Sequence, residues 1–162
     1  MMLSPGEIYY CERIKGDGTS GHWWVLLFVD ANVVRYVTAT SQIKPFVYRE
    51  GLQGLQQPKE QPDSVVFLDT QKIVGQNNLP IFSKPTILNC FHSMRSISLQ
   101  DFNTRIDRKL LRIVGRLPDR YLAQIVPSAR CSGQWSRVDV KQVLHAENGI
   151  GGCVNAFYDG LR

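Results

Sequence analysis

Residues 23–40 read WWVLLFVDANVVRYVTAT, and this stretch decides the fold. Trp23 to Val29 is a continuous apolar run of strand length, the pattern of a strand that is covered on both faces. Residues 30–32 form a short turn, after which Val33 to Thr40 is rich in β-branched residues and predicts a second strand. Two strands so close in sequence pair as a hairpin. We therefore expect a β-hairpin over residues 23–40.

Further strands are expected on both sides of this hairpin. Glu7 to Ile14 is rich in β-formers and leads into a Gly-rich loop at residues 15–21. A polar, Gln-rich stretch at residues 45–63, broken by glycines and prolines, predicts a long loop. Short apolar stretches predict later strands at residues 64–69, 86–91 and 110–117.

Helices are expected mainly late in the chain. Ser98 suits an N-cap, with Asp101 three residues on in a capping-box-like position. Pro118 suits the first turn of a second helix, which Pro127 should kink or end. A third helix is expected at residues 136–145. The pattern predicts a β-rich fold, mainly β with peripheral helices, built on a small, strongly bent antiparallel sheet or barrel.

The composition excludes some classes of function and favours others. A chain of 162 residues with 43% hydrophobic residues and a mean hydropathy of -0.18 predicts one soluble domain. It has neither the ~18 consecutive apolar residues of a membrane span nor a signal peptide, so we expect a cytoplasmic protein without a membrane partner. The four cysteines lack the spacing of zinc sites, so no metal and no cofactor is expected. The net charge of +5 favours a polyanionic partner such as nucleic acid.

A series of short motifs runs along the chain. They are SPGEI at residues 4–8, the Gly-rich loop and strand at 16–27, TSQ at 40–42, KPTILNC at 84–90, RSI at 95–97 and IVGRLP at 113–118. In this order and spacing they resemble the MazF/PemK toxin family of type II toxin–antitoxin systems. The resemblance covers residues 4 to about 132. It predicts a barrel domain at residues 1–132 and a C-terminal extension at residues 133–162 that packs on the same domain.

The resemblance implies both a fold and an activity. The fold is a small SH3-like barrel of the CcdB/MazF type, usually a homodimer, with a cognate antitoxin protein as partner. The activity is metal-independent cleavage of single-stranded RNA, often messenger RNA, to 2′,3′-cyclic phosphate and 5′-hydroxyl ends. Such cleavage needs a base for the 2′-hydroxyl, an acid for the leaving 5′-oxygen and hydrogen-bond donors for the anionic phosphate.

His22 occupies the position where the family has its catalytic arginine, at the head of the strand after the Gly-rich loop. An imidazole suits either proton-transfer role near neutral pH, and hydroxyl groups can orient a phosphate. We therefore predict His22, Thr40 and Ser41 as catalytic residues, although a core-edge histidine and ordinary strand-end hydroxyls fit the same pattern. RNA contacts are predicted for Arg13, Lys15, Tyr48, Asn89, His92 and Arg95.

Two other functions fit the same residues. The barrel could be a non-catalytic module that binds a protein, as CcdB relatives of the fold do, and the absence of the family's arginine favours this. Six basic residues between Arg105 and Arg120, against two acidic ones, favour a regulator that binds nucleic acid, although such a run is also typical of a solvated face. RNA cleavage that persists in EDTA distinguishes the enzyme from both.

Overall fold

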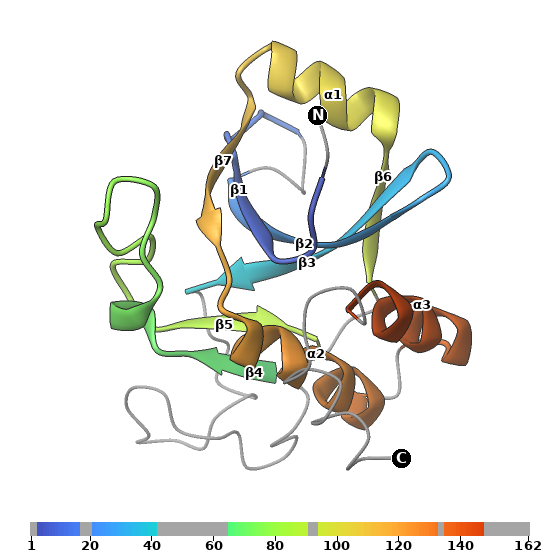
Figure 1. Ribbon diagram of the computed structural model, residues 1–162. Helices are drawn as coiled ribbons and strands as arrows, with labels where there is room; N and C mark the ends of the chain where they lie inside the picture. Colours follow the sequence, from blue (N-terminus) through green and yellow to red (C-terminus); the bar gives the residue numbers. More distant parts are fainter. Residues whose placement is uncertain (1–2, 17–20, 42–64, 91–93, 133–134, 148–162) are drawn as a thin grey trace.

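The computed structural model describes residues 3–16, 21–41, 65–90, 94–132 and 135–147 (Figure 1). These residues form a seven-stranded antiparallel sheet, a short 3-10 helix and three α-helices. The strands are β1 (Glu7–Cys11), β2 (His22–Asp30), β3 (Val33–Thr40), β4 (Val65–Leu68), β5 (Thr86–Asn89), β6 (Arg95–Ser98) and β7 (Leu111–Arg116). The helical elements are η2 (Thr70–Lys72), α1 (Leu99–Asp107), α2 (Asp119–Ser132) and α3 (Arg137–Glu147). The predicted β-rich fold with peripheral helices is confirmed.

The hairpin predicted for residues 23–40 lies at the centre of the sheet. β2 and β3 pair from Trp23 opposite Ala39 to Asp30 opposite Val33, with a register shift between Leu26 and Phe28 that marks a bulge. A bulge bends the strand that carries it and increases its twist. β1 pairs with the outer edge of β2, while β5 and β6 pair with the outer edge of β3, giving the order β4-β5-β3-β2-β1-β7 with β6 beside β3. β2 is therefore paired along both of its edges, and its unbroken apolar run is typical of a strand that is covered on both faces.

Each face of the sheet is covered by helices, because successive strand residues point to opposite faces and both sets here are apolar. On one face, which we call the α1 face, Phe102 of α1 packs edge-on against Tyr9 with ring centroids 5.2 Å apart. On the other, the α2 face, Leu122 and Ile125 of α2 and Val143 of α3 are fully buried in a second cluster. Figure 1 shows α1 on one side of the sheet and α2 with α3 on the other.

Two hydrogen bonds that involve tyrosine hydroxyls stabilise this arrangement. The backbone N–H of Asp69, just after β4, donates to the hydroxyl of Tyr121 in α2 over 2.9 Å. On the α1 face the Tyr9 hydroxyl donates to a Glu7 carboxylate oxygen over 2.7 Å. Burial, followed by this contact with Glu7, raises the pKa of Tyr9 well above its ordinary value, so the hydroxyl keeps its proton in the folded protein.

The sheet is open, because no ladder joins its edge strands β4 and β7 in the described part of the chain. The loop that follows η2 comes close to closing it. Gly75 forms an isolated bridge with Gly115 of β7, and the Gln76 N–H donates to the Val114 carbonyl over 3.3 Å. A Cβ on Gly75 would lie 2.8 Å from the Val114 carbonyl oxygen, so glycine is what permits this approach.

Replacing Gly75 with alanine is expected to lower the free energy of unfolding by about 1–3 kcal/mol, the usual cost of overpacking. The carbonyl that the new methyl group would meet belongs to strand backbone and cannot rotate away. Urea denaturation measures the loss. Ser83→Ala, an exposed site in the same loop, is the control and should change stability by less than about 0.5 kcal/mol. Equal stability of Gly75→Ala and the parent protein would contradict the close approach of the loop to β7.

The helix predictions are largely confirmed. The Ser98 side chain accepts the Asp101 N–H at the start of α1 over 3.0 Å, as the capping pattern predicts. The suggestion that Pro127 ends the second helix is wrong, because α2 runs on to Ser132. A proline removes one helical hydrogen bond, and the burial of neighbouring residues such as Ile125 and Val126 offsets that loss. β6 was not predicted, since its sequence RSIS has one apolar residue; it forms by pairing with the edge of β3.

The C-terminal part of the described chain contributes to the main core. Val140 and Val143 of α3 lie in the same buried cluster as α2, and Gln142 donates to an Asp30 carboxylate oxygen over 3.1 Å. A division into a domain at residues 1–132 and an extension at 133–162 stays a prediction. None of the helices within the described ranges is long and apolar enough to cross a bilayer.

Candidate functional site

His22 and Thr40 share one face of the sheet. His22, half-buried, is the first residue of β2 and pairs with Cys11 of β1. The ladder with β3 begins at the pair of Trp23 and Ala39, and His22 and Thr40, the last residue of β3, directly follow that pair on their strands. Because successive strand residues point to opposite faces, His22 and Thr40 both lie on the face opposite that of Trp23 and Ala39. The imidazole and the hydroxyl predicted to act together are therefore on the same side of the sheet.

The face that they share is the α1 face. His22 alternates along β2 with Trp24, which lies in the cluster covered by Phe102. Thr38 pairs with Trp24 and so points the same way. Thr40 pairs with Ile87, and Asn89 two residues further along β5 has the same orientation. Four half-buried polar residues thus gather at one end of this face, a group that we call the polar cluster: His22, Thr38, Thr40 and Asn89.

Two predicted RNA contacts lie at the border of the polar cluster. Arg95 is exposed and pairs with Tyr36 of β3, so its Cβ is also on the α1 face. β5 and β6 both pair with β3, one after the other, which puts Asn89 and Arg95 on the same edge of that strand. Arg13 lies beside Gly21, since a Cβ on that glycine would be 3.3 Å from the Arg13 Nε. Its guanidinium is therefore close to the residue that precedes His22.

The remaining predicted residues are not brought into this group. Ser41 is half-buried but lies one residue beyond β3, outside the ladder that places Thr40. Lys15 is exposed in the loop after β1. Tyr48 and His92 lie outside the described residues. The structure thus joins His22, Thr40 and Asn89, with Arg95 and Arg13 nearby, and leaves the role of Ser41 without geometric support.

Arg105 of α1 is a site residue that the sequence placed only in the basic run at residues 105–120, without a catalytic role. Its Nη1 donates to the Cys11 Sγ over 3.3 Å, and its Cζ lies 5.6 Å from the centroid of the Trp24 ring. Cys11 faces His22 across the ladder, and Trp24 is the next residue along β2 on that face. The guanidinium therefore lies on the face that carries His22 and comes from helix α1, not from the start of β2. The available signal was helical spacing, because Arg105 follows the buried Phe102 by three residues.

Stacked aromatic rings support this guanidinium. The rings of Trp24 and Tyr36 are nearly parallel, at 15°, with centroids 4.2 Å apart, and both residues are almost completely buried. A rigid aromatic surface under a guanidinium holds its plane in place through a cation–π contact. The orientation of Arg105 toward the polar cluster is thus fixed by packing.

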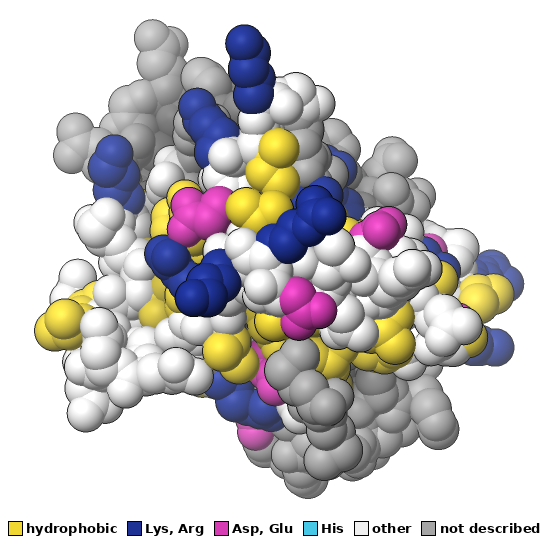
Figure 2. All heavy atoms as spheres, turned by 90° about the horizontal axis from the view of Figure 1, so that it is seen from above, with side chains coloured by type: hydrophobic (Ala, Val, Ile, Leu, Met, Phe, Trp, Pro, Cys, Tyr) yellow, Lys and Arg dark blue, Asp and Glu magenta, His cyan; other side chains and the backbone are white. Residues whose placement is uncertain are grey.

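Charges on the α1 side of the molecule are mixed. Figure 2, which looks onto α1, shows Lys and Arg side chains spread over this side with Asp and Glu side chains between them. Part of the basic run at residues 105–120 is also already engaged: Arg105 contacts Cys11, Arg112 pairs with Glu12 at 2.9 Å, and Arg120 lies over the Tyr121 ring. The run is therefore not a continuous basic stripe of the kind that tracks a nucleic-acid backbone.

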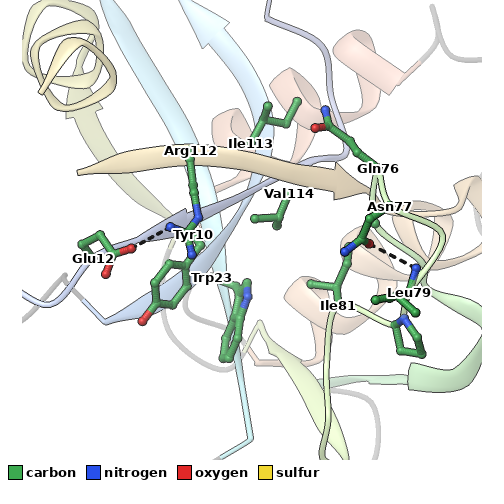
Figure 3. A pocket seen from close by; sticks show the side chains of 12 residues that line it. Tyr10, Glu12, Trp23, Gln76, Asn77, Leu79, Ile81, Arg112, Ile113 and Val114 are labelled. Atoms are coloured by element: carbon green, nitrogen blue, oxygen red, sulfur yellow. Dashed lines mark hydrogen bonds and ion pairs between the residues drawn. The ribbon is translucent and has the colours of Figure 1, made fainter. Parts of the chain in front are cut away.

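A groove opens on the opposite face at the same end of the sheet (Figure 3). It has a volume of about 660 Å³, and one wall consists of Arg112, Tyr10 and Trp23, which lie in one row across β7, β1 and β2. The other wall is the loop after η2. The lining residues are Tyr10, Glu12, Trp23, Gly75, Gln76, Asn77, Leu79, Pro80, Ile81, Arg112, Ile113 and Val114. None of them was predicted as a site residue.

No protein-family model matches this chain, and a comparison with curated proteins finds no match either. The family and the activity implied by the motifs therefore rest on the sequence pattern and on the geometry of the polar cluster.

Proposed function

We propose that the protein is a MazF/PemK-type toxin that cleaves single-stranded RNA without a metal ion. The observation that carries this proposal is that His22 and Thr40 lie on one face of the sheet, where the Arg105 guanidinium contacts Cys11, the ladder partner of His22. The imidazole can act as the base of a phosphodiester transesterification, and the guanidinium and the hydroxyl can donate hydrogen bonds to the anionic phosphate. His22 stands at the start of β2 where the family has its catalytic arginine. This replacement is compatible with the activity because Arg105 of α1 supplies a guanidinium instead.

The reaction assigns a role to each group. The His22 imidazole takes the proton of the 2′-hydroxyl, whose oxygen attacks the adjacent phosphorus. In an in-line displacement the leaving 5′-oxygen lies on the far side of the phosphorus from the attacking oxygen, so the same imidazole does not reach both. The bond from phosphorus to the 5′-oxygen then breaks, that oxygen takes a proton from a water molecule, and the imidazolium gives its own proton to the resulting hydroxide through solvent. The products are a 2′,3′-cyclic phosphate and a 5′-hydroxyl.

The donors around the imidazole stabilise the charge that develops on the phosphate. The forked guanidinium of Arg105 fits two phosphate oxygens, and the Thr40 hydroxyl and the Asn89 amide provide further donors on the same face. Arg95 and Arg13, at the border of the polar cluster, would hold the neighbouring phosphates of the strand. We retain Ser41, Lys15, Tyr48 and His92 as secondary candidates from the sequence pattern.

The fold and the partners of the family belong to the same proposal. The bridge between Gly75 and Gly115 brings the loop after η2 against the edge strand β7 of the sheet. This approach supports an SH3-like barrel. A homodimer, a cognate antitoxin and a cytoplasmic location follow from the family resemblance.

Incubation with a fluorescent single-stranded RNA in excess EDTA tests the activity. We expect cleavage to products with 2′,3′-cyclic phosphate and 5′-hydroxyl ends, which mass spectrometry identifies. The matched substrate is the same oligonucleotide with 2′-O-methyl groups, which should stay intact because it lacks the nucleophile. RNA that remains uncut over hours would refute the enzyme and leave the protein-binding alternative. Cleavage that EDTA abolishes would refute the metal-independent mechanism.

A further inference from the structure

The groove on the α2 face and the polar cluster on the α1 face involve adjacent residues of the same strands. Tyr10 and Trp23, which line it, are the strand neighbours of Cys11 and His22 and therefore point to the opposite face. β1 ends at Cys11 and β2 begins at His22, so both sites lie at one rim of the sheet. A single strand of RNA that rounds this rim can place a phosphate at His22 and an adjacent base in the groove.

We propose that this groove binds a nucleobase of single-stranded RNA, an inference that rests on the proposed function. Its volume of about 660 Å³ is in the range of small-molecule sites, which is roughly 300–1,000 Å³. Unstacked bases bind on aromatic rings and on arginine planes, and their edges form hydrogen bonds with polar side chains. The groove offers each of these elements.

The stacking surface consists of Tyr10, Trp23 and Arg112. The two rings are tilted by 54°, with centroids 5.4 Å apart, so they do not cover each other as a stacked pair would. Arg112 reaches over the Tyr10 ring, with Cζ 5.2 Å from its centroid, and pairs with Glu12 at 2.9 Å. The Arg112 side chain is 61% exposed, so this ion pair is weak and can yield to a nucleotide. Figure 3 shows all four side chains on one wall of the groove.

The opposite wall offers hydrogen-bonding groups for the edge of a base and apolar side chains for its faces. The amides of Gln76 and Asn77 carry both donors and acceptors, as the edge of a base does. Asn77 Oδ1 accepts the Leu79 N–H over 3.1 Å, which fixes the orientation of that amide (Figure 3). Of the five exposed large hydrophobic residues in the described part of the chain, Leu79 lines the groove and Val74 adjoins it, whereas the Ile113 side chain points away from it (Figure 3). An apolar rim of this kind matches the faces of a base and a ribose.

Binding of an uncleavable 2′-O-methyl RNA oligonucleotide, measured by fluorescence anisotropy in EDTA, tests the proposal independently of cleavage. Tyr10→Ala should raise the Kd at least about fivefold, the lower end of what the loss of one base–aromatic stack costs. Arg112→Gln should weaken binding more than Arg116→Gln, an exposed arginine on the same strand that does not line the groove. With an abasic nucleotide at the bound position, the difference between Tyr10→Ala and the parent protein should disappear.

Two results would overturn the proposal. The first is a folded Tyr10→Ala protein, with an unchanged circular dichroism spectrum, that binds the intact oligonucleotide as tightly as the parent protein. The second is Leu79→Asp converting a dimer to a monomer in size-exclusion chromatography without changing the Kd, which would make the groove an interface between copies. Groove-dependent binding without cleavage of ordinary RNA would instead count against the nuclease alone, and cleavage that groove variants leave unchanged would count against the groove alone.

Discussion

Replacing His22 with alanine is expected to lower the rate of RNA cleavage about 100-fold, within the usual range for loss of general acid–base catalysis. The variant keeps the Thr40 hydroxyl and the Arg105 guanidinium, but none of the other described residues of the polar cluster takes the 2′-hydroxyl proton near neutral pH. Because the side chain is only half-buried at the start of β2, the fold should tolerate its removal. Initial rates on a fluorogenic RNA in EDTA, with a thermal melt of each variant, provide the measurement.

His145→Ala is the matched control for the loss of one imidazole. His145 belongs to α3, on the opposite side of the sheet from the polar cluster, so this variant should cleave at the parent rate. The cleavage rate of Thr40→Ala should lie between those of His22→Ala and His145→Ala, because a hydroxyl orients the phosphate without carrying the proton. A His22→Ala protein that melts normally and cleaves at the parent rate would show that the base lies elsewhere.

Arg105→Ala is expected to lower kcat about 100-fold with a smaller change in KM, as removal of a donor that stabilises the transition state does. The same truncation removes a contact with Cys11 and with the Trp24 ring, so a loss of stability is also expected. Arg105→Lys keeps the charge but not the fork, and should recover only part of the rate. Kinetics on the folded fraction, with urea melts of each variant, separate catalysis from packing.

Arg108→Ala is the control for this experiment, because Arg108 follows α1 directly and is exposed. It should leave both kcat and stability close to the parent values. Added methylguanidine should restore part of the rate of Arg105→Ala, an effect that a packing role alone would not produce. If Arg105→Ala loses stability while its folded fraction cleaves normally, Arg105 only holds α1 on the sheet.

Local chemistry was sufficient to predict much of the fold. The apolar run at residues 23–29 and the β-branched run at 33–40 are β2 and β3, since neighbours along the chain and across a two-residue turn decide a hairpin. Ser98 begins α1 because its hydroxyl meets an N–H three residues away, a contact that depends on little else. His22 and Thr40 were predicted as site residues from the family resemblance, and only the register between β2 and β3 places them on one face.

Contacts between distant parts of the chain decided the rest. Arg105 and Cys11 are separated by 94 positions, and only the docking of α1 on the sheet brings the guanidinium to Cys11, the ladder partner of His22. The groove joins β1, β2 and β7 to a loop that approaches β7 because Gly75 and Gly115 have no side chains. A sequence pattern records preferences over a few residues, which is enough for strands, caps and faces. It does not record which faces meet, because that depends on the packing of the whole core.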